Sequence, residues 1–363
     1  MSEFAVRSKG YTPFANINSS LDVELNFIRF SQSVLLQLRS SKSSSQEKIK
    51  LLSLSKEKLD EFFEIRISGL QNKLKQARNE SGITDSDVKR INEQLHEQVD
   101  KLTVDQYGLL FESILPGLTQ EKVCFLSSQQ WSDSQKDWLK QYFKTNLIPL
   151  LSPISLDLTH PFPRIQNKTL YYIVALSGVD AYGRENGKAI IQQPQVLEQY
   201  VHLPSSFSSG RGEEFVLMDM LVQEFAADLF NGLDVEGIYP FRVTRAFDSE
   251  NYDFRDCDQG VASKDQKTRL DGKIVRLETS KSCPLSVLTY LCNTLNIEEN
   301  DIYTTNGPID LNVYAKAISS LKSRQKEGFQ ILFEGINNLM GQTRKKVNTL
   351  AISLKQKLGR LLN

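Results

Sequence analysis

The sequence contains few of the residues that build metal and redox sites. Its 363 residues include only four cysteines and three histidines, and no two cysteines stand in a CxxC pair. Since zinc and redox motifs need such clusters, we expect no metal site and no cofactor held by this chain. The motifs GxxxxGK[ST], GxGxxG and HExxH are also missing. Their absence excludes the commonest phosphate-binding loops and the zinc-protease helix.

Long apolar runs are missing as well. The longest one near a strand-like segment covers Leu170 to Leu176, far below the roughly 20 residues that cross a bilayer. The chain starts Met-Ser-Glu-Phe-Ala-Val-Arg, without the apolar core of a signal peptide. We therefore expect a cytoplasmic protein without a transmembrane segment, and free thiols fit that reducing compartment.

Charge is balanced over the whole chain but not along it. The sequence has 44 Lys and Arg against 44 Asp and Glu, and residues 316–363 hold ten of the basic residues and two of the acidic ones. That segment therefore carries a charge of +8, and the remainder carries −8. Such a bias predicts that the tail is a separate element.

Residues 14–118 are predicted to form an all-helical domain. Apolar residues recur there at intervals of three and four, as on the buried face of a helix. Two such stripes are Leu59, Phe62, Phe63, Ile67 and Leu70, and Ile91, Leu95, Val99 and Leu102. We expect Asp85 to cap the second of these helices, and Ser40–Ser45 to be a polar loop.

Residues 119–315 are predicted to form an α/β head domain on a small sheet, which makes the chain an α+β protein. Runs rich in β-branched and aromatic residues cover 169–176, 237–245 and 273–279. Helical patterns lie between and after them, at 218–230 and 285–295. Strands that alternate with helices are typical of such a domain. The polar stretch 247–267 is expected to be an exposed loop.

Residues 316–363 are predicted to form a basic amphipathic helical tail. Lysines and arginines surround one apolar stripe, made of Val347, Leu350, Leu354, Leu358 and Leu361. Packing on this chain or on a second copy explains such a stripe better than binding to a membrane, a nucleic acid or polyphosphate. A third reading is that the tail has no function.

Six groups of residues occur in the order and spacing of one known family. The helical region contributes Glu24-Leu25-Asn26-Phe27 with Phe30 and Val34-Leu35, then Leu59-Asp60-Glu61-Phe62-Phe63 with Arg66 and Gly69-Leu70. The second region contributes Leu151-Ser152-Pro153 with His160-Pro161-Phe162-Pro163 and Asn167, then Tyr239 to Arg245, Val275 to Glu278 and Asn306 to Leu311. Together they resemble the bacterial polyphosphate kinases of the histidine-phosphorylating type across about residues 20 to 315.

The resemblance implies a helical N-terminal domain, a head domain that mediates dimerisation, and two C-terminal domains of the phospholipase D type. In that family the terminal phosphate of ATP passes to polyphosphate through a phosphohistidine, assisted by Mg²⁺. The reacting histidine, its arginines and the metal site belong to the two C-terminal domains, which have no counterpart in this sequence. We therefore assign no catalytic residue and no metal ligand, and ATP and Mg²⁺ are implied by the family only.

One nucleotide-contacting position is implied by the resemblance. In the family, the asparagine just before the LDEFF motif touches the nucleotide, and that position is Lys58 here. A lysine lacks the amide group but can still reach a phosphate. Lys58 is thus the one candidate nucleotide-binding residue.

Histidines and charged clusters elsewhere favour structural roles. His160 lies in a His-Pro-Phe-Pro segment, which is typical of a rigid turn. His96 is expected to be solvated, and His202 has no partner that the sequence reveals. A phosphoryl-accepting histidine needs cations or a metal beside it, and His160 has Arg164 nearby in the sequence but no carboxylate pair to hold Mg²⁺.

Two further groups of charges are also better explained by structure. Arg242 and Arg245 are three residues apart on a predicted strand, so they should face opposite sides and not form one phosphate clamp. Another group is expected to form a solvated helix face rather than a nucleotide-facing edge around Lys58. Its members are Asp60, Glu61, Glu64 and Arg66.

Three functions are compatible with this sequence. The leading hypothesis is a non-catalytic polyphosphate-kinase-like protein that dimerises or regulates a full-length kinase. The second is one half of a split ATP-polyphosphate phosphotransferase. The third is a polyanion-binding module or a truncated remnant. The expected partners are a second copy, a full-length kinase or its catalytic half, and polyphosphate, but no specific nucleic acid.

Overall fold

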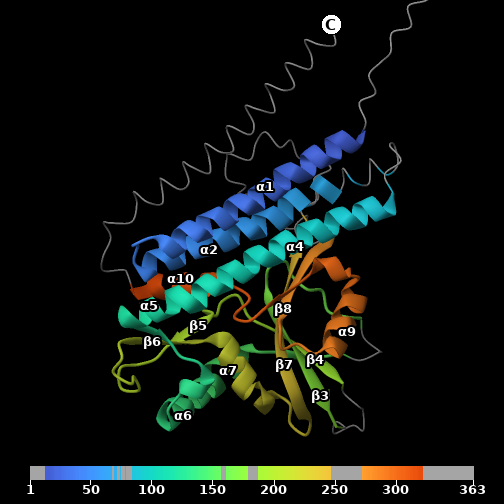
Figure 1. Ribbon diagram of the computed structural model, residues 1–363. Coiled ribbons are helices and arrows are strands. Elements are labelled where there is room, and N and C mark those ends of the chain that lie inside the picture. Colours follow the sequence, from blue (N-terminus) through green and yellow to red (C-terminus); the bar gives the residue numbers. More distant parts are fainter. Residues whose placement is uncertain are drawn as a thin grey trace, which may run out of the picture. The chain divides into compact units, whose positions relative to one another are not determined.

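The structure is a computed structural model (Figure 1), and it describes residues 13–67, 69–71, 74, 78, 84–156, 161–178, 187–246 and 272–321. The chain divides into two compact units, Met1–Ala317 and Ile318–Asn363. The helical region and the sheets therefore belong to a single unit. Of the second unit, only Ile318–Leu321 is described.

The helical region contains α-helices and short π-helical segments. Helix α1 covers Pro13–Ser40 and α2 covers Ser45–Glu61, followed by a π-turn at Phe62–Ile67. Helix α4 covers Asp85–Leu109, continues through a π-turn at Leu110–Ile114 and ends in α5, Leu115–Gln120. Their apolar stripes are buried against one another, as the spacing predicts.

Two capping boxes start the helices of this region. The side chain of Ser44 caps α2 together with Glu47, and Thr84 caps α4 together with Asp87. In each case the hydroxyl accepts a backbone N–H while the carboxylate accepts the N–H of the cap residue. The prediction that Asp85 caps α4 was wrong by one position, because the β-branched Thr84 holds the extended cap conformation and Asp85 is the first helical residue.

The head region contains a six-stranded sheet in the order β2-β4-β3-β7-β8-β9. Its central strands are β3 (Leu170–Ser177), β7 (Asp234–Arg245) and β8 (Ile274–Ser280). The outer strands are β2 (Pro153–Ser155), β4 (Lys188–Gln192) and β9 (Ile302–Thr305). Neighbouring strands are antiparallel except β8 and β9, which are parallel and are connected through helix α9 (Leu285–Leu295).

A second, three-stranded sheet completes this region. It has the order β1-β6-β5, with β1 at Val123–Phe125, β6 at Glu213–Leu217 and β5 at Tyr200–His202. Helix α6 (Asp133–Tyr142), helix α7 (Met218–Phe225) and helix α10 (Asn312–Leu321) are the other helices of eight or more residues in the described part of this region. The head is thus larger in strand content than the small single sheet that the sequence predicted.

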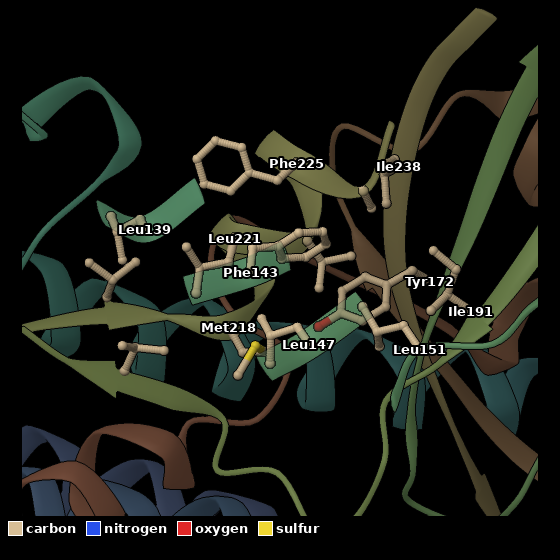
Figure 2. Close-up of a cluster of buried hydrophobic side chains, with 14 of the residues drawn as sticks. Leu139, Phe143, Leu147, Leu151, Tyr172, Ile191, Met218, Leu221, Phe225 and Ile238 are labelled. Atoms are coloured by element: carbon tan, nitrogen blue, oxygen red, sulfur yellow. The ribbon is translucent and has the colours of Figure 1, made fainter. Parts of the chain in front are cut away.

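Strand β3 is buried on both faces, so alternate residues enter two different cores. Tyr172 and Val174 join the core formed with α6 and α7, which also contains Phe143, Leu221 and Phe225 (Figure 2). Tyr171 and Ile173 join a second core with Phe241 and the buried residues of α9. A strand with two buried faces has a continuous apolar sequence, which explains why this run was recognisable from the sequence.

Polar groups also lie at the first core, around the hydroxyl of Tyr172. The hydroxyl of Tyr172 lies 2.9 Å from Gln193 Oε1 and 2.8 Å from Asp219 Oδ1. Burial raises the pKa of Asp219 to about 6. The hydrogen bond from the Tyr172 hydroxyl opposes that shift, but burial outweighs it.

The structure confirms the predicted fold class, a helical region followed by a mixed head. Strands β3, β7 and β8 and helix α9 coincide with the predicted runs to within a few residues. The predicted loop at 247–267 and the amphipathic stripe of the tail lie outside the described residues. Among the helices that the structure describes, none is long and apolar enough to cross a membrane.

Candidate functional site

Lys58, the predicted nucleotide-binding residue, lies on the accessible side of helix α2. Its side chain is 33% exposed, and its ammonium group pairs with Glu61 at 2.6 Å, three residues later on the same helix. The position is therefore open to a ligand. Any anion that approaches Lys58 must share it with the carboxylate of Glu61.

The opposite side of the same helix carries two buried charges, Lys56 and Asp60. They are four residues apart, so they share one face of α2. Their residues are only 1% and 6% exposed. The prediction that Asp60 belongs to a solvated face was wrong, because its partners come from strands far along the chain that a helical wheel does not show.

Arg242 of strand β7 connects this helix to the sheet. It donates Nη1 and Nη2 to the two carboxylate oxygens of Asp60 at 3.1 and 3.0 Å. It also donates Nε and Nη2 to Glu278 of strand β8 at 2.9 and 2.6 Å. A guanidinium that bridges two carboxylates in this way uses its planar fork on both of them.

Arg276 and Lys56 complete the network. Arg276 donates to Asp60 and to the hydroxyl of Thr244, and its guanidinium lies 4.4 Å from the centre of the Phe63 ring. Lys56 Nζ donates to Glu278. Five charged side chains from α2, β7 and β8 are thereby enclosed together, and we call them the buried ion network: Lys56, Asp60, Arg242, Arg276 and Glu278.

The network contains three cations and two carboxylates. Burial alone would raise the pKa of Asp60, but the charges of Arg242 and Arg276 outweigh it and hold that pKa well below its usual range. The same balance lowers the pKa of Glu278. Burial lowers the pKa of Lys56, and Glu278 opposes that shift. Lys56 is thus the member whose charge costs the most to keep.

A smaller polar contact ties the next turn of helix to the head. Glu64 accepts the amide of Asn167 at 2.7 Å and the ammonium of Lys168 at 2.8 Å. The other amide atom of Asn167 accepts the backbone N–H of Arg245 at 2.9 Å. Glu64, like Asp60, therefore faces the head and not solvent alone.

The remaining predicted candidates have separate surroundings. Arg242 and Arg245 do face different partners, since Arg245 donates to the backbone oxygens of Ile165 and Gly272. His96 is not simply solvated, because its ring lies 4.7 Å from that of Tyr303 and its Nδ1 lies 2.9 Å from Asn300 O.

The last two histidines are resolved differently. His202 pairs with Glu213 at 2.7 Å on the neighbouring strand, and its ring stacks on Phe215 at 4.8 Å. His160 lies outside the described residues. In the part of the chain that the structure describes, no three His, Cys, Asp or Glu residues are grouped as metal ligands would be.

The motif residues thus converge on a closed joint rather than on an open catalytic pocket. Sequence reasoning considered the charges of Asp60 and Arg242, included Arg276 and Glu278 only as parts of a motif, and missed Lys56. One signal was available: Arg276 and Glu278 are two residues apart in an apolar strand and so point to the same face. Two opposite charges on one face of a buried strand predict an internal ion pair.

Comparison with known proteins assigns the family. The family model described as "Polyphosphate kinase N-terminal domain" matches residues 21–126, and the one described as "Polyphosphate kinase middle domain" matches residues 134–317. The chain therefore belongs to the polyphosphate kinase family, as the motifs predicted.

Individual relatives agree with this assignment. The chain is 36% identical over 296 residues to a polyphosphate kinase of Pseudomonas syringae pv. tomato, and 33% identical over 331 residues to one of Neisseria meningitidis serogroup B. These matches cover 79% and 90% of this chain, but only 39% and 47% of the relatives. The crystal structure of polyphosphate kinase from Porphyromonas gingivalis shares the fold, with a TM-score of 0.62 at 20% identity over 80% of this chain and 39% of that one.

Proposed function

We propose that these 363 residues form a scaffold for polyphosphate kinase chemistry and do not catalyse phosphoryl transfer by themselves. The observation that carries the proposal is the buried ion network. The charged side chains of α2, β7 and β8 pair with one another and so join helix α2 to the sheet. Their charges are enclosed and cannot meet a substrate phosphate.

The scaffold would act through association. We propose that it forms a homodimer through the head region, or a heteromer with a full-length polyphosphate kinase, in the cytoplasm. The family's use of the head for dimerisation supports this, as does the match of the middle-domain model to residues 134–317. A regulatory role follows if the scaffold replaces one subunit of an active assembly.

The test is an activity assay followed by a mixing experiment. The purified chain with ATP and Mg²⁺ should make no polyphosphate, because phosphoryl transfer depends on a positioned metal and cationic groups. Added to a full-length polyphosphate kinase, it should co-sediment with the kinase and change its rate of synthesis. The proposal would be contradicted if the chain alone synthesised polyphosphate from ATP. It would also be contradicted if the chain sedimented as a strict monomer and did not bind the kinase.

A split enzyme is the second candidate, and Lys58 is the observation that favours it. The resemblance implies that Lys58 stands at the family's nucleotide-contacting position, and its side chain is accessible. If the catalytic domains are supplied as a separate polypeptide, the mixture should synthesise polyphosphate from ATP. Lys58→Ala should then raise the KM for ATP more than it lowers kcat, and Lys58→Asn should restore it. A mixture without activity would leave only the non-catalytic scaffold.

A further inference from the structure

A pocket lies where the π-turn at Phe62–Ile67, helix α4 and the start of strand β9 meet. It contains about 320 Å³ of space that no atom fills, part of it continuous with solvent. Its apolar wall includes Phe63, Ile67 and Leu95. The lining includes neither Lys58 nor any member of the buried ion network. The pocket is therefore distinct from the site described above.

Four polar side chains also line this pocket. They are Gln71, Asn92, Asp301 and Tyr303. Within the described residues, none of these side chains takes part in a hydrogen bond or an ion pair. Polar groups that are enclosed in a protein nearly always have a partner. Four of them without one, around a single pocket, leave their hydrogen bonds to water or to a ligand.

Tyr303 is the most buried of the four, with 4% of its surface exposed. Its ring contacts the ring of Phe63 edge-on at 5.3 Å and lies 4.7 Å from the ring of His96. Burial raises the pKa of Tyr303, and the negative charges of Asp301 and Asp100 raise it further, so the hydroxyl stays protonated. The hydroxyl is thus fixed in position by packing while its own hydrogen-bonding capacity is unused.

The charge of the pocket is negative. Asp301 ends the turn Glu299–Asp301 that precedes β9, and it is half-buried. Burial raises the pKa of Asp301 to about 6, although the positive charge of Lys273 opposes the rise. Lys273 is not part of the lining, and no lining side chain is a lysine or an arginine. At neutral pH the pocket therefore presents a carboxylate that a bound cation would stabilise.

We propose that this pocket binds a small primary ammonium ion with a short alkyl chain. An ammonium group has three hydrogen-bond donors and no acceptor. The pocket offers it the carboxylate of Asp301, the hydroxyl oxygen of Tyr303 and two side-chain amide oxygens. The aromatic rings at the pocket attract a cation as well, and the apolar wall accommodates the alkyl chain.

The amine site goes beyond the proposed function and does not rest on it. An anion is disfavoured, because the only charged side chain of the lining is a carboxylate. A neutral alcohol of the same length would fill the apolar wall but would leave the carboxylate without a counter-charge. The positive charge of the ligand is therefore the property that the pocket selects.

The test is a titration of the full chain with n-butylammonium chloride, followed by ligand-observed NMR at about pH 8, where the Asp301 carboxyl is ionised. A ligand this small is expected to bind with a Kd of about 1 mM. Asp301→Asn should raise the Kd at least about tenfold, because a charge-assisted contact is lost while the shape is kept. The control is Asp137→Asn, which removes the same charge from an exposed position of α6 and should change the Kd by less than about twofold.

A second variant keeps the test valid if Asp301→Asn does not fold. Tyr303→Phe removes only the hydroxyl and should raise the Kd about threefold. It should not lower the melting temperature, because this hydroxyl has no hydrogen bond to lose within the described residues. An unchanged Kd for Tyr303→Phe would contradict the proposed contact.

Two uncharged or oppositely charged probes test the selectivity for a cation. n-Butanol and butyrate have the same alkyl length as far as the head group, and each should bind at least about tenfold more weakly than n-butylammonium. Equal binding of n-butanol would overturn the proposal, and so would tighter binding of butyrate. Equal losses in Asp301→Asn and Asp137→Asn would mean diffuse attraction to acidic surface, and would overturn it too.

The absence of saturable binding by the wild type at tens of millimolar n-butylammonium would also refute the amine site. The titration uses this chain alone and contains no polyphosphate, ATP or kinase. Its result is therefore independent of whether the chain associates with a kinase, and failure of one proposal does not imply failure of the other.

Discussion

Replacing Asp60 by asparagine should destabilise the whole of Met1–Ala317. Asp60 accepts both Nη atoms of Arg242 and one hydrogen bond from Arg276, all inside the buried ion network. With an amide in its place, three buried cations share Glu278 alone. Removing one partner from a buried ion pair costs about 3–5 kcal/mol of unfolding free energy. For a protein of ordinary stability, whose free energy of unfolding is about 5–15 kcal/mol, that loss is a fifth or more of the total.

Replacing Lys56 by methionine should have the opposite character. It leaves two arginines and two carboxylates, which is a balanced set, and it removes a cation whose pKa is lowered by burial. We expect a change within about 1 kcal/mol of zero, or a gain, because well-packed apolar groups often replace buried ions without loss. The methionine side chain has a similar length and no charge to bury.

Urea denaturation at neutral pH measures both changes. The control is Glu61→Gln, which breaks the exposed pair with Lys58 on the same helix and should cost less than about 1 kcal/mol. The free energies of unfolding are compared only between proteins with the same m-value, so that a difference in midpoint reports a difference in stability. A loss below about 1 kcal/mol for Asp60→Asn, or a loss above about 3 kcal/mol for Lys56→Met, would refute the charge-balance argument.

Three further outcomes are expected. Asp219→Asn should remove part of the pH dependence of the free energy of unfolding. The pKa of Asp219 in the folded protein is about 6, above the ordinary 3.8. The contribution of this group to wild-type stability is therefore complete below about pH 4 and is lost as the pH rises to about 6. Because this residue is partly exposed, we expect a difference of about 1–2 kcal/mol between wild type and variant to develop over that window, as measured by urea melts at several pH values. A parallel pair of curves would contradict it. Gly212→Ala should lower the free energy of unfolding by at least about 2 kcal/mol, since the φ of Gly212 is 127° and a Cβ would lie 2.2 Å from Lys122 O. The control Gly210→Ala has open space around it and should cost about 1 kcal/mol. Equal losses in thermal melts would count against the steric explanation. Deletion of residues 336–363 should lower the melting temperature or the oligomeric state if the tail packs on this chain or on a second copy. If the tail binds polyanions instead, the deletion should reduce only the salt-sensitive retention of polyphosphate. No change in any of the three measurements would mean that the tail has no function.

Elements with strong local patterns could be predicted from the sequence. Strand β3 is apolar at nearly every position because both of its faces are buried. Helix α9 starts after Pro284 and ends at the left-handed Asn296, so both of its ends are marked by local residues. In such places the information that determines the structure lies within a few residues.

Short strands and buried charges could not be predicted in this way. Strands β1, β2 and β5 have three residues each and form only because a partner strand pairs with them. Asp60 looks like an ordinary exposed helix residue until Arg242 and Arg276 reach it. Helical periodicity does not indicate partners that lie far along the chain. The sequence of α2 therefore gave no local signal that Asp60 belongs to the buried ion network.

The buried ion network also determines when the chain can finish folding. Asp60 is separated from Arg242 by 182 residues and from Arg276 by 216, and Lys56 is separated from Glu278 by 222. Contacts this distant along the chain form slowly. During synthesis at about 5–20 residues per second, helix α2 emerges roughly 10–45 s before strand β8. For that interval helix α2 presents an apolar face and two charges, Lys56 and Asp60, whose partners have not yet been synthesised.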